Sequence, residues 1–349
     1  MLGRACWALL VIGIGLLALT SRLVAEEGGP APPDWVSALH RDHPLVGTVW
    51  SVRDERAVSP DELVERLKPA ALVLLGEVHD NPDHHRLRAW LIGRLAREES
   101  AGRENGPAVV FEHIRADQQP IVDAFRASPD RGVSSILLDK LEWSRSGWPP
   151  AEMFRPLFDE VLGHDLPVLG GNAPSNQVRQ VAQKGLSALS DVERTRLAVD
   201  QQLDTPLRDA LIEEIEENHC GLLPERAFAP MALAQQYRDA HLADVLLQAQ
   251  RQHGTAVLIA GNGHVRADRG VPWHLIRRAP HLATSVVSFV EVEAGQEEAA
   301  RYLPRDPNGQ PAVDYVWFTP KAEREDPCER MRRGMKGEKG ASPKQPSGR

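Results

Sequence analysis

Three short apolar runs in this sequence are each followed, within a few residues, by a histidine and by a carboxylate or amide side chain. The runs are residues 71–75, 108–111 and 256–260, and the polar residues that follow them are Glu77, His79, Glu112, His113, Asn262 and His264. An unbroken apolar run of this length is typical of a strand that is buried on both faces, as in a parallel sheet. Because parallel strands end at the same edge of a sheet, where ligands collect, we expect these side chains to form one site.

Segments with helical patterns alternate with the apolar runs along most of the chain. Helices are predicted at 60–68, 82–99, 118–127 and 228–252, and further strands at 165–169, 284–292 and 314–318. This alternation predicts an α/β fold with a mainly parallel central sheet flanked by helices, over residues 45–320. Residues 177–218 have no strand pattern, and we expect a helical subdomain that extends to about residue 254.

The two ends of the chain differ in character from its middle. Residues 1–25 combine an early arginine with a short apolar stretch, which is typical of a secretory signal peptide. We therefore expect an exported protein, periplasmic or associated with the cell envelope, that contacts a membrane only if this segment stays uncleaved. Cys6 precedes the apolar stretch, so its position does not suit a lipid-modified cysteine. Residues 321–349 are rich in charged and small residues and predict a disordered tail.

Charge, motifs and cysteine content narrow the range of functions. The formal net charge is −8 at pH 7 and no nucleic-acid-binding motif is present, so we expect no nucleic-acid partner. The sequence also lacks a glycine-rich nucleotide-binding motif and a Gly-x-Ser-x-Gly elbow.

Beyond the predicted signal peptide, only two cysteines remain, Cys220 and Cys328. We favour a buried free thiol for each, with a disulfide between them as the alternative in an oxidising compartment.

The clustered residue types suit metal binding or acid–base chemistry. The candidate catalytic residues are Glu77, His79, Glu112, His264 and Arg266. In a metal-dependent hydrolase, Glu77 would act as general base, and Glu77, His79 and His264 are also ligand types for zinc, iron or manganese. Arg115 or Arg266 would bind a carboxylate or stabilise an oxyanion. The structural alternative is that each histidine only makes a hydrogen bond within the fold.

Six short segments together resemble the ChaN family of haem-binding proteins. The segments are 76–85, 111–114 with 118–119, 146–149, 170–172, 218–220 and 261–266. The family lies within the Tiki/TraB-like superfamily and is linked to bacterial iron uptake, and the resemblance extends from about Gly47 to Phe318. It implies an α/β fold with a helical subdomain, a surface-attached or periplasmic location, and haem held at the interface of a homodimer.

The resemblance also implies which residues hold the cofactor. Iron ligation in the family is by tyrosine, and Tyr237 in the predicted helix 228–252 is the candidate in this chain. His113, Arg115 and His219 are further candidates for haem contacts, and the tryptophan-bearing loop 143–148 is a candidate apolar wall. Tiki-like and erythromycin-esterase-like relatives imply the alternative function, a metal-dependent hydrolase that holds a divalent metal in place of haem.

A stability expectation follows if Glu77 and His79 serve a ligand and do not serve the fold. A carboxylate buried beside imidazoles without a cation strains its surroundings. We then expect Glu77→Gln and His79→Ala to leave the melting temperature unchanged or to raise it, while ligand or metal binding falls.

Overall fold

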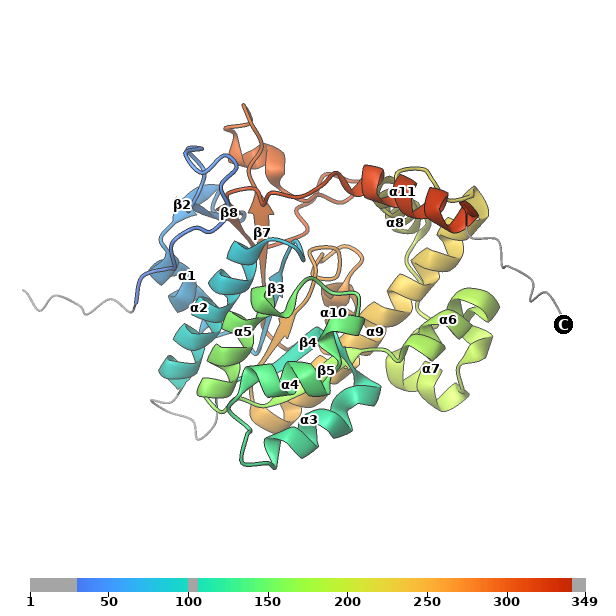
Figure 1. Cartoon of the computed structure of the whole chain (residues 1–349), viewed down its shortest axis with the longest axis horizontal. Helices are drawn as coiled ribbons and strands as arrows, with labels where there is room; N and C mark the ends of the chain where they lie inside the picture. Colours follow the sequence, from blue (N-terminus) through green and yellow to red (C-terminus); the bar gives the residue numbers. More distant parts are fainter. Residues whose placement is uncertain (1–29, 100–105, 341–349) are drawn as a thin grey trace, which may run out of the picture. The chain divides into compact units, whose positions relative to one another are not determined.

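The computed structural model of the chain describes residues 30–99 and 106–340 (Figure 1). The predicted signal peptide therefore lies outside the described residues. Within these described ranges, no helix combines the length and the apolar character needed to cross a membrane.

In the described part of the chain, eight strands form one sheet at the centre of the fold. The strands are β1 (Val49–Ser51), β2 (Arg56–Val58), β3 (Leu72–Gly76), β4 (Ala108–Arg115), β5 (Val168–Asn172), β6 (Ala256–Ile259), β7 (Thr284–Glu291) and β8 (Tyr315–Thr319). Their order is β2-β1-β8-β7-β3-β6-β4-β5. Every neighbouring pair from β8 to β5 is parallel, whereas β1 is antiparallel to both of its neighbours. The predicted α/β fold with a mainly parallel sheet is confirmed.

Helices cover both faces of this sheet because alternate strand residues point to opposite sides. Val73 and Leu75 of β3 face a core formed with α1 (Pro60–Leu67), α2 (Pro82–Glu99), α3 (Gln119–Arg126), α4 (Ser134–Lys140) and α5 (Ala151–Gly163). Leu72 and Leu74 face α9 (Phe228–His253) and α10 (Val271–Arg278). Full burial of one such leucine or valine contributes about 1.5–3 kcal/mol, so the predicted apolar runs supply the two cores.

Asn81 fixes the point at which α2 begins. Its side-chain oxygen accepts hydrogen bonds from the backbone nitrogens of Asp83, at 2.9 Å, and His84, at 3.4 Å. Its side-chain nitrogen donates to Glu291 at 2.7 Å, which ties the helix start to the end of β7. Proline at the first helical position costs no hydrogen bond there. This start sets the rotation of α2, and therefore which of its side chains face the end of β3.

A helical lobe follows β5, as predicted for residues 177–218. It comprises α6 (Ser175–Lys184), α7 (Asp191–Leu197) and α8 (Thr205–Asn218). The amino-terminal part of α9 belongs to the lobe, where Tyr237 and Ala240 join its apolar core. From Leu242 onward, α9 packs under the sheet. The lobe therefore ends within α9, short of the predicted residue 254. Short 3₁₀ helices lie at Ala116–Gln118, Trp143–Arg145, Gly185–Ala188, Glu225–Ala227 and Ala299–Tyr302.

The segment after β8, where we predicted a disordered tail from residue 321, contains a helix that extends to residue 340. Lys321 donates its backbone hydrogen to the oxygen of Leu39 at 2.9 Å. Arg324 forms ion pairs with Asp80, at 2.9 Å, and with Glu291, at 2.5 Å. Helix α11 (Pro327–Gly340) follows, and Figure 1 draws it beside α8. Ion pairs and backbone pairing hold this charged segment, and residues 341–349 lie outside the described ranges.

Cys220 and Cys328 form a disulfide, so the free-thiol interpretation is wrong. Their Cα atoms are 5.7 Å apart, and 108 positions separate them in the sequence. Cys220 follows α8 and Cys328 lies at the start of α11. The sequence could not reveal this pairing because two distant cysteines carry no information about their separation in space. The bond joins the helical lobe to the segment that follows the sheet.

Candidate functional site

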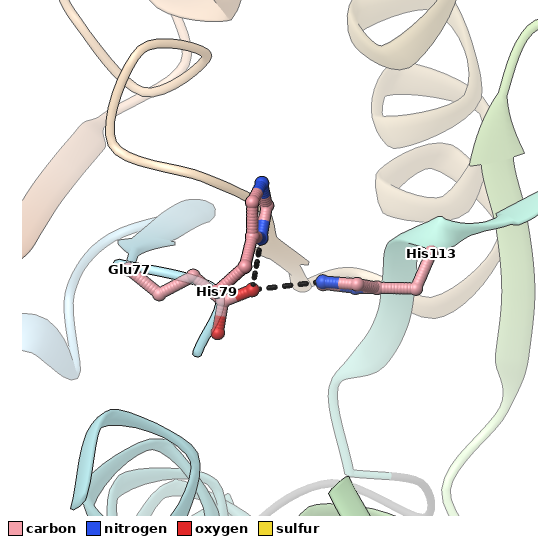
Figure 2. Close-up of side chains that lie close together, drawn as sticks. All are labelled: Glu77, His79 and His113. Atoms are coloured by element: carbon pink, nitrogen blue, oxygen red, sulfur yellow. Dashed lines mark hydrogen bonds and ion pairs between the residues drawn. The ribbon is translucent and has the colours of Figure 1, made fainter. Parts of the chain in front are cut away.

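Glu77 is the centre of a buried polar cluster at the end of β3. One of its carboxylate oxygens, Oε1, lies 2.8 Å from His79 Nδ1 and 2.8 Å from His113 Nε2 (Figure 2). The other oxygen, Oε2, forms an ion pair with Arg88. A carboxylate only accepts hydrogen bonds, so both imidazoles must turn an N–H toward it. The strand ends of β3 and β4 therefore meet, as the sequence predicted.

Two residues of α2 complete the surroundings of Glu77. His85 Nε2 donates to the backbone oxygen of His79 at 2.9 Å, so its Nδ1 is free to accept from Arg88 at 2.6 Å. Burial lowers the pKa of His85 to about 4, which keeps this imidazole neutral. His84, which shares a helical face with Arg88, turns instead toward Thr319, at 2.9 Å. The sequence did not identify Arg88 as the cation that neutralises Glu77.

His79 is the member of this cluster that is accessible from outside. Burial lowers the pKa of His79, and it lowers the pKa of His113 well below its usual range, so both imidazoles are neutral at pH 7. With its hydrogen on Nδ1, His79 carries a lone pair on Nε2, and no described residue hydrogen-bonds to that atom. Its side chain is 36% exposed, whereas the side chain of His113 is 0% exposed.

A second cluster surrounds Glu112 of β4. His264 lies between two carboxylates, with its Nε2 3.0 Å from Glu112 and its Nδ1 2.5 Å from Asp239. Arg238 also donates a hydrogen bond to Glu112, at 2.6 Å. Burial lowers the pKa of His264, but the charges of Glu112 and Asp239 outweigh this and raise it to about 9. Burial raises the pKa of Glu112, yet the His264 and Arg238 charges hold it well below its usual range. Both nitrogens of the charged His264 are donors, so the imidazole has no lone pair for the metal role predicted from the sequence.

Gly261 lets the two clusters lie side by side. It follows β6, the strand between β3 and β4, and its backbone nitrogen donates to Glu112 at 2.8 Å. A Cβ atom at this position would lie 2.9 Å from His79 Cε1 and 3.0 Å from His79 Nε2. Such contacts are too close, so any side chain here would displace the His79 ring. The predicted convergence of three strand ends therefore depends on this glycine.

Aromatic side chains of the predicted tryptophan-bearing loop cover the cluster. The Trp148 ring centroid lies 4.9 Å from that of His79 and 4.6 Å from that of His113. Trp148 also donates its indole hydrogen to the backbone oxygen of His113 at 3.1 Å. Phe154, at the start of α5, packs 4.7 Å from His113. The loop therefore lies against the cluster, and its role as an apolar wall for haem stays a prediction.

Two predicted arginines are engaged elsewhere. Arg266 pairs with Asp268 at 2.9 Å and donates to the backbone oxygen of Arg305, where it lines an open cavity of about 700 Å³. Arg115 pairs with Asp117 at 3.0 Å and lines a separate cavity of about 590 Å³. Neither guanidinium contacts the Glu77 or Glu112 cluster within the described part of the chain. The arginines that do so are Arg88 and Arg238.

Two predicted cofactor ligands also lie outside the clusters. His219 directly follows α8, and its Nδ1 donates to the backbone oxygen of Ile215 at 2.7 Å. Tyr237 is 1% exposed, and its hydroxyl donates to Gln177 at 3.0 Å within the core of the lobe. Burial raises the pKa of Tyr237 to about 12, which opposes formation of the phenolate that binds ferric iron. The predicted axial role of Tyr237 therefore does not fit this arrangement.

The fold and the site define an α/β protein with a neutralised Glu/His/Arg network at the carboxyl ends of its parallel strands. Residues 63–275 match the family described as haem-binding uptake, Tiki superfamily, ChaN. The chain belongs to this family, and it is a ChaN-family haem-binding domain. The match spans β3, β4 and β6 and includes every residue of the two clusters.

Solved structures agree with the family at the level of the fold. The ChaN protein of Campylobacter jejuni, described with cofacial heme binding, is 18% identical, has a TM-score of 0.59, and covers 77% of this chain and 95% of that chain. A mutant of the erythromycin esterase EreC, in its open conformation, is 13% identical, with a TM-score of 0.40 over 80% of this chain and 99% of its own. A similarity as low as the second carries no argument about function. No curated protein matches the sequence.

Proposed function

We propose that this protein binds haem at the carboxyl ends of β3, β4 and β6, and that it serves haem or iron uptake in the bacterial cell envelope. The observation that carries this proposal is the family match over residues 63–275, which contains the whole site. The predicted signal peptide and the Cys220–Cys328 disulfide support an exported protein, because disulfides persist in oxidising compartments.

The residues at the site suit haem in two respects. A haem site needs an axial ligand with a free lone pair and apolar surface against the macrocycle. His79 offers the first and Trp148 the second, and both side chains are partly exposed. One chain supplies a wall on one side only, so we expect a second copy of the protein to cover the other face of the macrocycle.

Haemin titration tests this function directly. We expect the purified protein to shift the Soret band of haemin and to saturate at a fixed stoichiometry, because a defined ligand and wall fix one geometry. Size-exclusion chromatography of the loaded protein should give the mass of a dimer. A spectrum that stays identical to free haemin over the whole titration would remove the proposal.

Gly261→Ala should weaken haem binding by about tenfold or more, the cost typical of disturbing the support of a metal ligand. The added methyl group would lie 3.0 Å from His79 Nε2 and must push the ring off Glu77. Haemin titration of the variant measures the loss. Gly263→Ala is the matched control in the same loop, because its Cβ would meet only Glu214, at an ordinary 3.5 Å. Equal affinity for the two variants would contradict the placement of haem at this site.

A divalent metal is the second candidate ligand. One atom from each of Glu77, His79 and His113 lies within 4.8 Å of the others, which is the spacing of a three-ligand metal site. The nitrogen atoms of His79 and His113 that face Glu77 both carry a hydrogen. In this arrangement neither of these nitrogens has a lone pair for a metal held between the three side chains. Moving the His113 hydrogen to Nδ1 would also leave a buried donor unpaired, because that atom has no partner. Metal analysis of the purified protein distinguishes this candidate from haem.

A further inference from the structure

We propose that a cavity between the end of β4 and the start of α6 binds a phosphate group, carried by a small organic molecule or as the free anion. The cavity measures about 590 Å³ and is lined by Arg115, Asp117 and residues 174–177 and 179. This size lies within the range of about 300–1,000 Å³ of small-molecule sites. None of the lining residues belongs to the Glu77 or Glu112 cluster, so the inference goes beyond haem binding and does not rest on it.

The cavity lies beyond the carboxyl ends of β4 and β5, at the edge where open parallel sheets bind ligands. Arg115 is the last residue of β4 and pairs with Asn172, the last residue of β5. Phe111 pairs with Gly170, so β4 advances four positions where β5 advances two. Bulges of this kind change the direction in which a side chain points and are frequent beside functional sites. The irregular pairing thus ends at a cationic residue that lines the cavity.

The guanidinium of Arg115 keeps donors available for a ligand. Its Nε donates to Asp117 at 3.0 Å, and no described residue accepts from its two terminal nitrogens. The side chain is 35% exposed. Asp117 therefore holds the plane of the guanidinium while the terminal N–H groups stay open to the cavity. Such a planar pair of donors matches two oxygens of a phosphate group.

Arg179 supplies a second cation from α6. Its side chain is exposed and has no hydrogen-bond or ion-pair partner among the described residues. Asp117 is the one carboxylate among the lining residues, and Arg115 already neutralises it. The charged lining residues are two arginines and one aspartate, which leaves a net charge of +1 in a chain whose formal net charge is −8. The cavity is therefore a locally cationic place on an acidic protein.

The start of α6 adds backbone donors to the same cavity. Pro174 precedes the helix and provides no side-chain cap, so the first backbone N–H groups, those of Ser175 and Asn176, have no partner within the helix. Such groups and the helix dipole favour an anion. The side chain of Gln177 accepts a hydrogen bond from Tyr237 at 3.0 Å, which fixes this helix start to the core of the lobe. The donors are therefore held in place before a ligand arrives.

The set of donors suits phosphate better than a carboxylate. A phosphate ester offers three acceptor oxygens and a charge close to −2 at neutral pH, whereas a carboxylate offers two oxygens and a single charge. Two guanidinium groups from separate elements can each bind a different oxygen pair of one phosphate, and the backbone N–H groups can reach the third. The remaining volume of the cavity has room for an organic substituent.

Isothermal titration calorimetry of the purified full-length protein at low salt tests the proposal, with glycerol phosphate and inorganic phosphate as probes. We expect saturable binding at one site per chain. Tighter binding of glycerol phosphate would assign the phosphate to an organic ester and equal binding to the free anion, and either result supports the site. No saturable binding of either probe would overturn it.

Replacing Arg179 tests the second cation. Arg179→Gln should weaken binding of the tighter probe by about tenfold, because a charge-assisted hydrogen-bond pair is lost. Arg179→Lys keeps the charge without the planar fork and should fall between the variant and the wild type. Lys184→Gln is the matched control, because Lys184 lies in the last turn of the same helix and does not line the cavity. Equal losses in Arg179→Gln and Lys184→Gln would contradict the site.

The backbone donor of Ser175 can be removed without breaking α6. Proline is well tolerated at the first helical position, and Pro174 already has ψ 132°, which suits a residue before proline. Ser175→Pro should bind the probe about threefold to tenfold more weakly than Ser175→Ala, which loses the hydroxyl alone. Circular dichroism checks that both variants are folded. Equal affinities would show that the helix start does not contact the anion.

The pH dependence and haemin separate phosphate from a carboxylate ligand. Affinity for glycerol phosphate should rise between about pH 5 and pH 7, because the second pKa of a phosphate ester is about 6 and no lining residue is a histidine. Acetate binding as tightly as glycerol phosphate would refute the phosphate assignment. Haemin affinity should be the same in Arg179→Gln and the wild type, and a fall would assign the cavity to the haem carboxylates instead. If the wild type binds glycerol phosphate but not haemin, this proposal stands and the haem proposal fails.

Discussion

Arg88→Met should lower the free energy of unfolding by about 3–5 kcal/mol, because it leaves the buried charge of Glu77 without its cation. Arg88 is fully buried, and its guanidinium meets only Glu77 Oε2 and His85 Nδ1 within the described chain. Urea or guanidinium unfolding of the apoprotein measures the loss. Methionine is close in volume to the arginine stem, so the missing charge and not a cavity dominates the effect.

Two further variants make this prediction specific. The double variant Glu77→Gln/Arg88→Met removes both charges, and we expect it to recover most of the loss, since a neutral pair needs no cation. Arg86→Met is the matched control on the same helix, because Arg86 is partly exposed and, among the described residues, bonds only a backbone oxygen, that of Asp34. If Arg86→Met lowered the free energy of unfolding as much as Arg88→Met does, the buried ion pair would not be the cause of the loss.

The same ion pair reverses the stability expectation derived from the sequence for Glu77. That expectation assumed a buried carboxylate beside imidazoles with no cation, whereas the fold supplies Arg88. Glu77 accepts two imidazole hydrogens and one guanidinium, so it stabilises the fold as well as orienting His79. Glu77→Gln should therefore lower the melting temperature. His79→Ala should do so much less, because that side chain is 36% exposed.

Removing the disulfide with Cys220→Ser/Cys328→Ser should lower the free energy of unfolding by roughly 2–5 kcal/mol. The bond closes a loop with a sequence separation of 108, so its loss gives the unfolded chain much more freedom. Denaturant unfolding with and without a thiol reductant measures the effect. Reductant should destabilise the wild type by the same amount and leave the double variant unchanged. A wild type insensitive to reductant, with a verified free-thiol content, would contradict the prediction.

The parallel core and the site that it carries were predictable from local patterns. The runs at 71–75, 108–111 and 256–260 form β3, β4 and β6, which are adjacent in the sheet. Helix α2 begins as predicted, because Asn81 and Pro82 mark its start. Adjacent parallel strands bring their carboxyl ends together, so the meeting of Glu77 with His113 and of Glu112 with His264 followed from topology.

The parts that failed depend on contacts between distant segments. Arg88 and Asp239 lie within helices, where a charged residue is ordinarily assigned to the solvent face. The strand predicted at 165–169 is observed at Val168–Asn172 because Gly170 and Gly171 belong to it. A Cβ at Gly170 would lie 2.5 Å from the backbone oxygen of Arg115, so these glycines permit close packing and do not end the strand. The assignment of Tyr237 came from the family resemblance and not from its surroundings.

The position of Cys328 also determines when the covalent bond can form during the life of the chain. Cys328 follows β8, so all eight strands precede it in the sequence. A chain that emerges amino terminus first presents every strand before the second thiol becomes available. The cross-link around residues 220–328 can therefore close only after the sequence of every strand is present. Oxidation of this pair is therefore a late event in the synthesis of the chain, and it joins two segments that lie on either side of the last two strands.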